Sequence, residues 1–400
     1  MMANRGKKDE KKAQSAPYTH RNWLAFDRGA KPVEIHEWPL YSDAWFVGEL
    51  HGLGPYTALN AVALAPRGRA RAALVLRGAL CADPRGEGNG KDSYHGSAHQ
   101  DEVAALLSLC IGVRLKAGGQ TRWFKDGKDP LGSPVGFGGQ MDWVLPERGV
   151  RLPRAVRDMN NPVNLDERVI AERLHSFHSL DSKSASVLVT SARLYQDALW
   201  LAESEPQLAW LFLVSAVETV AHHWQRRNKN HVERLAYSRP NLVEMLREQG
   251  GDELVRKVAL EIADYTGATL KFTEFVAAFD PGPPPDRRMR RLSVDWTSLR
   301  EATRLVYQWR SKALHGGTPF PFPMCAAPLI QGETWMAFTD EASGAIAERP
   351  FGLAAGVDGA MWDNEETPML LHVFEHITRG ALLRWWDSAI LPSSAAAKSP

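Results

Sequence analysis

A short segment near residue 310 carries the side chains best suited to chemistry. From Thr297 to Gly317 the chain reads TSLREATRLVYQWRSKALHGG, so Arg310, Ser311 and His315 stand close together before two glycines. An imidazole exchanges protons near neutral pH, and a guanidinium binds phosphate oxygens in bidentate fashion. Such a pair can cleave RNA without a metal, because the ribose 2′-OH supplies the nucleophile. We therefore assign Arg310, Ser311 and His315 as candidate catalytic residues.

The periodicity of this segment predicts a helix that presents these residues on its polar side. At about 100° per residue, the apolar side consists of Ala302, Leu305, Val306, Trp309 and Ala313. The polar side consists of Arg300, Arg304, Gln308, Ser311 and His315. An Arg-x4-His pattern also occurs at Arg173 with His178 and at Arg226 with His231, but neither pair lies on a strongly periodic helix that ends directly afterwards.

A run of arginines, DRRMRR, precedes this helix and adds positive charge next to it. Long basic side chains bind phosphates without reading the base sequence. The residues that we assign to RNA binding are Arg287, Arg288, Arg290, Arg291, Arg300, Arg304 and Lys312. A solvated charged loop is an equally good interpretation of the run itself.

These residues also carry a resemblance to a known family. The stretch VYQWRSKALHGG resembles the signature helix of the HEPN superfamily, whose ribonucleases have an Arg, a polar residue after it and a His four to six positions on. WLFLVSAVETVAHHW resembles the earlier bundle helix of the Apea-like branch, with Glu218 in the place of its usual acid, and LHVFEHITRGALLRWW is similar to its last helix. The resemblance covers roughly residues 185–390, and more faintly 100–135.

The resemblance implies a metal-independent endoribonuclease, as found in phage defence and toxin systems. It also implies a homodimer through the helical domain, in which Arg and His of both subunits converge on one cleft. Glu218 is expected to support the site, the partner is RNA, and neither a cofactor nor a metal is expected. The main alternative is a non-catalytic HEPN module that dimerises, binds nucleic acid or acts as a sensor.

A metal or nucleotide enzyme built on the N-terminal half is the third hypothesis. The segment YHGSAHQDE holds His95, His99, Asp101 and Glu102, which are possible metal ligands, but a glycine-containing loop interrupts them. The chain has no G-x-x-x-x-G-K-[ST], H-E-x-x-H or G-x-S-x-G motif. Polar residues that cap a helix are the simpler interpretation of this group.

The elements that must position the site indicate an α+β fold, with a β-rich N-terminal domain followed by an all-α HEPN-like helical bundle. DAWFVGEL, TALNAVALA and RAALVLRGAL predict strands, and Gln100–Ile111 predicts one helix among them. The helices predicted for the bundle are 184–203, 206–226, 241–264, 297–314 and 367–390. The predicted domains are a disordered basic arm (1–22), a β-rich recognition or regulatory domain (23–165), the bundle (166–390) with an insertion at 318–366, and a tail (391–400).

The composition excludes several other classes of protein. Of the 400 residues, 44% are hydrophobic and 24% are charged, which is typical of globular proteins and not of disordered or coiled-coil chains. The formal net charge of +1 provides no overall attraction to nucleic acid or membrane, so a basic surface must be local. Three distant cysteines predict no disulfide framework, and no apolar run is long enough for a membrane span. We expect a cytoplasmic protein.

Overall fold

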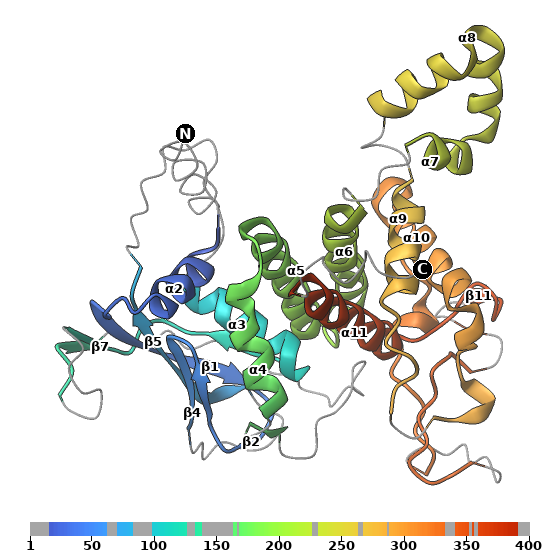
Figure 1. Ribbon diagram of the computed structural model, residues 1–400. Helices are drawn as coiled ribbons and strands as arrows, with labels where there is room; N and C mark the ends of the chain where they lie inside the picture. Colours follow the sequence, from blue (N-terminus) through green and yellow to red (C-terminus); the bar gives the residue numbers. More distant parts are fainter. Residues whose placement is uncertain are drawn as a thin grey trace, which may run out of the picture. The chain divides into compact units, whose positions relative to one another are not determined.

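A computed structural model describes residues 16–61, 70–82, 98–125, 133–137, 163–165, 168–225, 231–262, 267–285, 288–332, 341–351, 354–355 and 359–390. Over these residues the chain has a mixed α+β fold with an antiparallel sheet and a helical C-terminal region, as predicted (Figure 1). The chain divides into two compact units. The first unit takes the described residues up to 200 and from 383 onward, and the second takes those from 201 to 382.

The first unit is built on a sheet whose central strand the sequence did not predict. Its strands are β1 (Glu34–Ser42), β3 (Leu50–Leu53), β4 (Tyr56–Asn60), β5 (Arg71–Leu80), β6 (Lys116–Ala117), β7 (Arg122–Lys125) and β8 (Gly136–Phe137). They lie in the order β3-β4-β5-β1-β7-β8, and β6 also pairs with β1. Proline has no backbone N–H, and Pro39 lies where the partner of β1 changes from β7 to β6.

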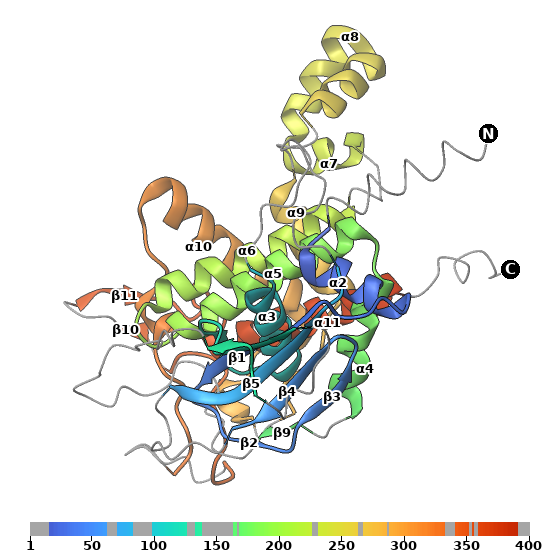
Figure 2. The same cartoon turned by 90° about the vertical axis from the view of Figure 1, so that its left-hand side faces the viewer.

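Helices cover the sheet and complete the core of this unit. They are α2 (Tyr18–Asp27), α3 (His99–Ile111), α4 (Arg168–Ser176), the 3-10 turn η1 (Phe177–Ser179) and α5 (Ser182–Leu201). Two short strands, β2 (Phe46–Val47) and β9 (Val163–Asn164), pair in parallel. The helix α3 is buried over most of its length and lies behind the sheet in Figure 2, which confirms the helix predicted at 100–111.

The start of the first unit corrects the predicted arm. Residues 1–15 and the predicted tail lie outside the described residues, but Tyr18–Asp27 is a helix. Trp23 is buried and packs on Tyr56 and Phe177, with ring centroids 5.4 Å and 5.9 Å away. Because this aromatic cluster buries one side of the helix, an arm cannot extend to residue 22.

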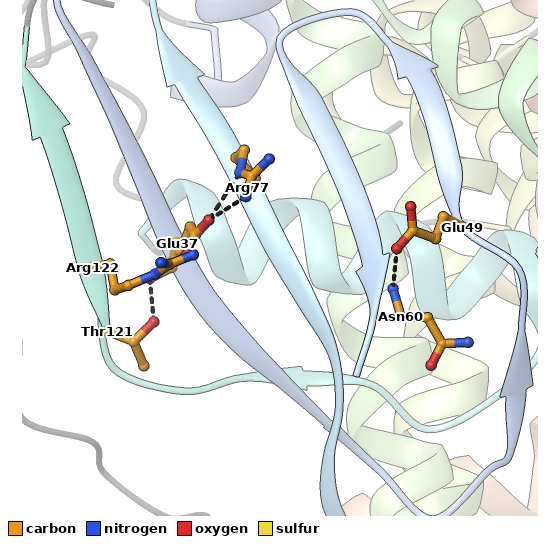
Figure 3. Close-up of polar contacts among 6 residues, drawn as sticks. All are labelled: Glu37, Glu49, Asn60, Arg77, Thr121 and Arg122. Carbon is orange, nitrogen blue, oxygen red and sulfur yellow. Dashed lines mark hydrogen bonds and ion pairs between the residues drawn. The ribbon is translucent and has the colours of Figure 1, made fainter. Parts of the chain in front are cut away.

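A buried carboxylate joins three strands of the sheet (Figure 3). Glu37 of β1 is 1% exposed and accepts hydrogen bonds at Oε1 from Nε and Nη2 of Arg77, at 2.9 Å and 2.7 Å. Its Oε2 accepts from Arg122 Nε at 2.5 Å. The two arginines come from β5 and β7, the neighbours of β1, so this cluster connects the centre of the sheet by charge as well as by backbone hydrogen bonds.

The second unit is a set of helices around an aromatic core. Its elements are α6 (Pro206–Gln225), α7 (His231–Ser238), α8 (Pro240–Glu261), α9 (Ala268–Ala278), η2 (Arg290–Leu292), η3 (Trp296–Ser298), α10 (Leu299–Gly316), η4 (Phe322–Cys325), β10 (Ala354–Ala355) and β11 (Met361–Trp362). The last helix, α11 (Leu371–Ile390), contributes residues to both units. Trp210 stacks on Phe320 and Phe374, and Phe272 of α9 packs on Tyr307 of α10.

The predicted bundle helices are all present, and their ends agree to within about four residues. The helix predicted at 241–264 is broken in the middle, because Gly250 and Gly251 have non-helical backbone angles. The helices α7 and α9 were not predicted, and the strand predicted from DAWFVGEL is reduced to short segments. None of the described helices is both long and apolar enough to cross a bilayer. The domain boundary near residue 165 stays a prediction.

The Glu37 cluster generates a first prediction. Glu37→Gln keeps the shape of the side chain but removes the charge that two arginines share, so we expect the free energy of unfolding to fall by about 1–3 kcal/mol. Glu49→Gln is the matched control, because a glutamine oxygen can still accept the backbone hydrogen bond from Asn60, and the other oxygen of Glu49 lies 3.0 Å from the exposed His51. Thermal and urea unfolding of the full chain measure the stability change of each variant. Equal effects of the two substitutions would contradict a special role for Glu37.

Candidate active site

The helix α10 exposes His315 as the periodicity predicts, whereas Arg310 is mostly buried. Val306 and Trp309 are buried on its apolar side, whereas Ser311 is half-buried and His315 is exposed. Arg310 lies between these extremes, with 19% of its side chain exposed. The imidazole is therefore exposed to solvent, and the guanidinium is only partly accessible.

Local interactions fix the turn before this helix and the end of the helix. Upstream, Asp295 caps the 3-10 turn η3 that leads into α10, and its Oδ1 accepts hydrogen bonds from the backbone N–H of Thr297 at 2.9 Å and from its hydroxyl at 2.6 Å. Downstream, Gly317 adopts a left-handed conformation (φ 66°) and its N–H donates to the carbonyl of Lys312. A glycine accepts this conformation without steric cost, so the helix ends directly after His315 and holds it in the last turn.

An acid on α6 binds two residues of α10. Glu218 Oε2 accepts from Arg310 Nη2 at 2.6 Å, and its Oε1 accepts from the Tyr307 hydroxyl at 2.7 Å. The carbon centre of the guanidinium also lies 5.5 Å from the centroid of the Tyr307 ring. Arg310 is thus held by a charge and by an aromatic ring, and Glu218 is in direct contact with one of the candidate catalytic residues.

Tyr307 is a member of this cluster that sequence reasoning missed. Its side chain is buried, and burial together with the hydrogen bond and negative charge of Glu218 raises the pKa of the phenol. The hydroxyl therefore stays protonated and acts as a donor to Glu218 at neutral pH. The available signal was its place one turn before Arg310, which puts both residues on the same side of the helix.

The remaining basic residues of α10 are solvent-accessible, but two of them already interact within the helix. Arg304 pairs with Glu301, its Nη2 lying 2.5 Å from Oε1. The Lys312 ammonium lies 3.9 Å from the centroid of the Trp309 ring. Arg300 is exposed near the start of the helix. These residues form a basic side of α10 that continues to His315.

The arginine run upstream is a structured segment rather than a free loop. Arg287 lies outside the described residues, while Arg288, Arg290 and Arg291 are exposed. The backbone N–H of Met289 donates to Ile346, and the N–H of Arg291 donates to Glu341 Oε1 at 3.0 Å. These contacts run to the insertion, so the insertion holds this segment in place.

A buried acid of the insertion, Glu348, also contacts the arginine segment and the residues after it. Glu348 is 2% exposed, its Oε2 accepts from the N–H of Val294 at 2.7 Å, and its Oε1 lies 3.8 Å from Arg288 Nε. Burial raises the pKa of this carboxyl, while the Val294 N–H and the Arg288 charge oppose that shift. The described part of the insertion leaves His315 exposed.

The possible metal ligands of the N-terminal half serve to pack α2 on α3. The His99 ring lies 4.8 Å from the Trp38 ring and 5.0 Å from the Tyr18 ring, and burial lowers the pKa of His99 to about 4. Glu102 accepts from the N–H of Thr19 at 3.0 Å, and burial raises the pKa of its carboxyl to about 7. His95 lies outside the described residues.

Arg310 and His315 of one chain do not face each other. Five residues along an α-helix correspond to about 140° of rotation and about 7.5 Å of rise. Comparison with known proteins finds no matching family model, no similar curated protein and no similar solved structure. The interpretation of the site therefore depends on its own geometry and charge, and the HEPN resemblance stays a prediction.

The Glu218 cluster generates a second prediction. Glu218→Ala leaves a largely buried arginine without its carboxylate, so we expect the free energy of unfolding to fall by about 1–3 kcal/mol. Tyr307→Phe removes one hydrogen bond and should cost about 1 kcal/mol. Urea unfolding measures both, and a double-mutant cycle of Glu218→Ala with Arg310→Ala measures their coupling.

Glu301→Ala is the control for this prediction. It also removes a carboxylate bonded to an arginine, but 59% of the Glu301 side chain is exposed. Exposed ion pairs contribute at most about 1 kcal/mol. A coupling of zero between Glu218 and Arg310, or a loss no larger than that of Glu301→Ala, would contradict the proposed positioning of Arg310.

Proposed function

We propose that this protein is a metal-independent endoribonuclease of the HEPN type. The observation that carries the proposal is the arrangement on α10, where Glu218 and Tyr307 hold Arg310 while His315 stands exposed in the last turn. One residue is positioned to bind a phosphate with little loss of side-chain entropy, and the other is accessible for proton transfer. These are the two requirements of RNA cleavage by the 2′-OH.

The reaction follows from the chemistry of these side chains. His315 takes the proton of the ribose 2′-OH as the oxygen attacks phosphorus, or gives a proton to the departing 5′-oxygen. Arg310 stabilises the charge that grows on the phosphate oxygens in the transition state. Ser311, four residues before His315, orients the imidazole or contacts the phosphate. The products are a 2′,3′-cyclic phosphate and a 5′-hydroxyl.

A buried donor on Arg310 supports a role in phosphate binding. Its Nε has no hydrogen-bond partner among the described residues, although Nη2 is bound to Glu218. Unsatisfied buried donors are rare and call for a specific explanation. We interpret this donor as one that a phosphate oxygen satisfies when the side chain shifts toward bound RNA.

A homodimer supports this chemistry better than a single chain. Since Arg310 and His315 point in directions about 140° apart, one helix does not direct both at the same phosphate. Two copies of α10 around a two-fold axis bring the arginine of one subunit toward the histidine of the other. We therefore propose a composite cleft between two copies of the helical region.

Phosphates outside the cleft are proposed to contact the basic side of α10 and the arginine segment. The described members are Arg288, Arg290, Arg291, Arg300, Arg304 and Lys312, all at least partly exposed. Because the insertion fixes the backbone of residues 288–291, these side chains extend from a defined surface. Such contacts position RNA without reading its sequence. The sheet-containing region is proposed to recognise the target or to regulate cleavage.

One observation favours a second candidate, a non-catalytic binding or sensing module. Glu218 already neutralises Arg310, so a phosphate must compete with a carboxylate for the guanidinium. In such a module Arg310 would have a structural role, and RNA would bind without being cut. Activity measurements on single-residue variants separate the two candidates.

The third prediction concerns catalysis. His315→Ala and Arg310→Ala should each reduce RNA cleavage by about 10²–10⁴-fold, because each removes a group that acts in the transition state. Cleavage of a labelled RNA by wild-type protein should continue in EDTA and yield a 2′,3′-cyclic phosphate end. The measurement is single-turnover cleavage followed on a denaturing gel.

Matched controls are His51→Ala and Arg256→Ala, which remove an exposed histidine of the sheet and an exposed arginine of α8. Both should cleave RNA at the wild-type rate. Full activity of folded His315→Ala would exclude this mechanism, as would equal rates on DNA and RNA. RNA binding without cleavage by the wild-type protein would favour the module.

The fourth prediction tests the composite cleft. Arg310→Ala and His315→Ala are purified separately, mixed, partly unfolded and refolded together, so that heterodimers form. Because a heterodimer retains one arginine and one histidine, the mixture should recover activity that neither variant has alone. Light scattering should give twice the mass of the chain. A monomer at micromolar concentration, or a mixture as inactive as its parts, would contradict the dimer.

A further inference from the structure

We propose that Asp27, His175 and His178 form a binding site for a borderline transition metal, with Zn²⁺ as the best fit. One ligand atom from each residue lies within 4.8 Å of the others, and they make up the one cluster of this kind found among the described residues. Two imidazole nitrogens and a carboxylate oxygen are ligands that Zn²⁺ prefers. All three residues belong to the first unit, whereas α10 belongs to the second.

Three neighbouring pieces of secondary structure provide the ligands. Asp27 is the last residue of α2, His175 lies in the last turn of α4, and His178 lies in η1. The carboxyl end of a helix carries a partial negative charge, so two helix ends that meet here favour a cation. The site would join α2 to α4, which are far apart in the sequence.

The hydrogen bonds of His178 leave its Nε2 suited to bind a metal. Its Nδ1 lies within hydrogen-bond distance of the carbonyl oxygen of His175, which can only accept, so Nδ1 carries the proton. In the neutral ring Nε2 then has a lone pair, which lies 3.4 Å from the Ser179 hydroxyl as well as 3.4 Å from Asp27 Oδ2, and a metal would replace the weak contact with the hydroxyl. Metal-binding histidines commonly show this arrangement, in which a backbone carbonyl fixes the tautomer.

The separation between two of the ligand atoms matches a zinc site. His178 Nε2 lies 3.4 Å from Asp27 Oδ2. With zinc bonds of about 2.0–2.1 Å at a tetrahedral angle, ligand atoms are about 3.4 Å apart. A lone pair facing a carboxylate oxygen at this distance is unfavourable unless a cation lies between them. A small rotation of the exposed His175 brings in the third ligand, and water takes the fourth position.

The core beneath the site is rigid enough to hold these side chains. Phe177, between the two histidines, is fully buried and packs on His20 and Trp386, with ring centroids 5.5 Å and 6.2 Å away. His20 Nε2 also lies 2.9 Å from the carbonyl oxygen of Leu180. Sites that rest on packed residues keep their geometry without the ligand, which reduces the entropic cost of binding.

The competing explanation is an ion pair between a protonated His178 and Asp27. In that case Nε2 carries a second proton and no metal is needed. The two explanations differ in stoichiometry and in their dependence on His175. A metal requires all three residues, whereas the ion pair requires only Asp27 and His178.

The experiment uses the full chain, dialysed against EDTA and then freed of it. Zn²⁺ is titrated calorimetrically, and Co²⁺ serves as a second probe because its visible absorption reports a tetrahedral site. We expect one ion per chain and a higher unfolding temperature with Zn²⁺. His178→Ala and His175→Ala should each raise the apparent Kd by at least about tenfold, and the temperature shift should disappear.

His51→Ala is the matched control, because His51 Nε2 also lies near a carboxylate, 3.0 Å from Glu49 Oε2, and the described residues place no third ligand beside this pair. It should bind Zn²⁺ as the wild type does. Circular dichroism confirms that each variant is folded. No binding by the wild-type protein, or binding that His175→Ala leaves unchanged, would overturn the proposal. RNA cleavage that continues in EDTA is compatible with this site, so failure here and failure of the proposed nuclease are distinguishable.

Discussion

The double hydrogen bond of Glu218 determines how α10 lies in the second unit. A carboxylate on α6 that binds Tyr307 and Arg310 fixes which side of α10 faces the other helices. Phe272 of α9 then packs on the Tyr307 ring, and the apolar side of α10 is buried. With this rotation set, the residues toward the end of α10 are left in solvent. Arg310, which we propose as the phosphate-binding group, is therefore also part of the framework that exposes His315.

The sequence predicted the long periodic helices well, because an apolar stripe over several turns is specific for a helix. The helices α3, α5, α6, α10 and α11 all lie close to their predicted positions. The central strand β1 escaped prediction because EIHEWPLYS has a proline and a buried acid, and the two arginines that bind the acid, Arg77 and Arg122, are far away in the sequence. Tertiary contacts, rather than the local sequence pattern, stabilise this segment as a strand.

Some residues of the candidate site could likewise be predicted from the sequence, and others could not. Spacing and residue type were sufficient to place Arg310 and His315, because both lie on one helix with a clear end. Tyr307 was not recognised because its role appears only when α6 is placed against α10. The ligands of the proposed metal site were equally hidden, since Asp27 and His178 are brought together only by the fold. The spacing of residues in the sequence therefore identifies candidate residues that lie on one helix. Clusters formed by residues of different elements are recognised only in the structure.

The two ends of the insertion are attached at almost the same place on α10. Thr318 donates its N–H to the carbonyl of Lys312, and the carbonyl of Glu366 accepts from Trp309 Nε1 at 2.8 Å. Its two ends are thus attached three residues apart on α10. A segment with such close ends can change in length or content at little entropic cost to the helices that carry it. Evolution can therefore vary the exposed parts of this segment, and with them the surface beside α10, while Phe320, which packs on Trp210, and α10 itself stay the same.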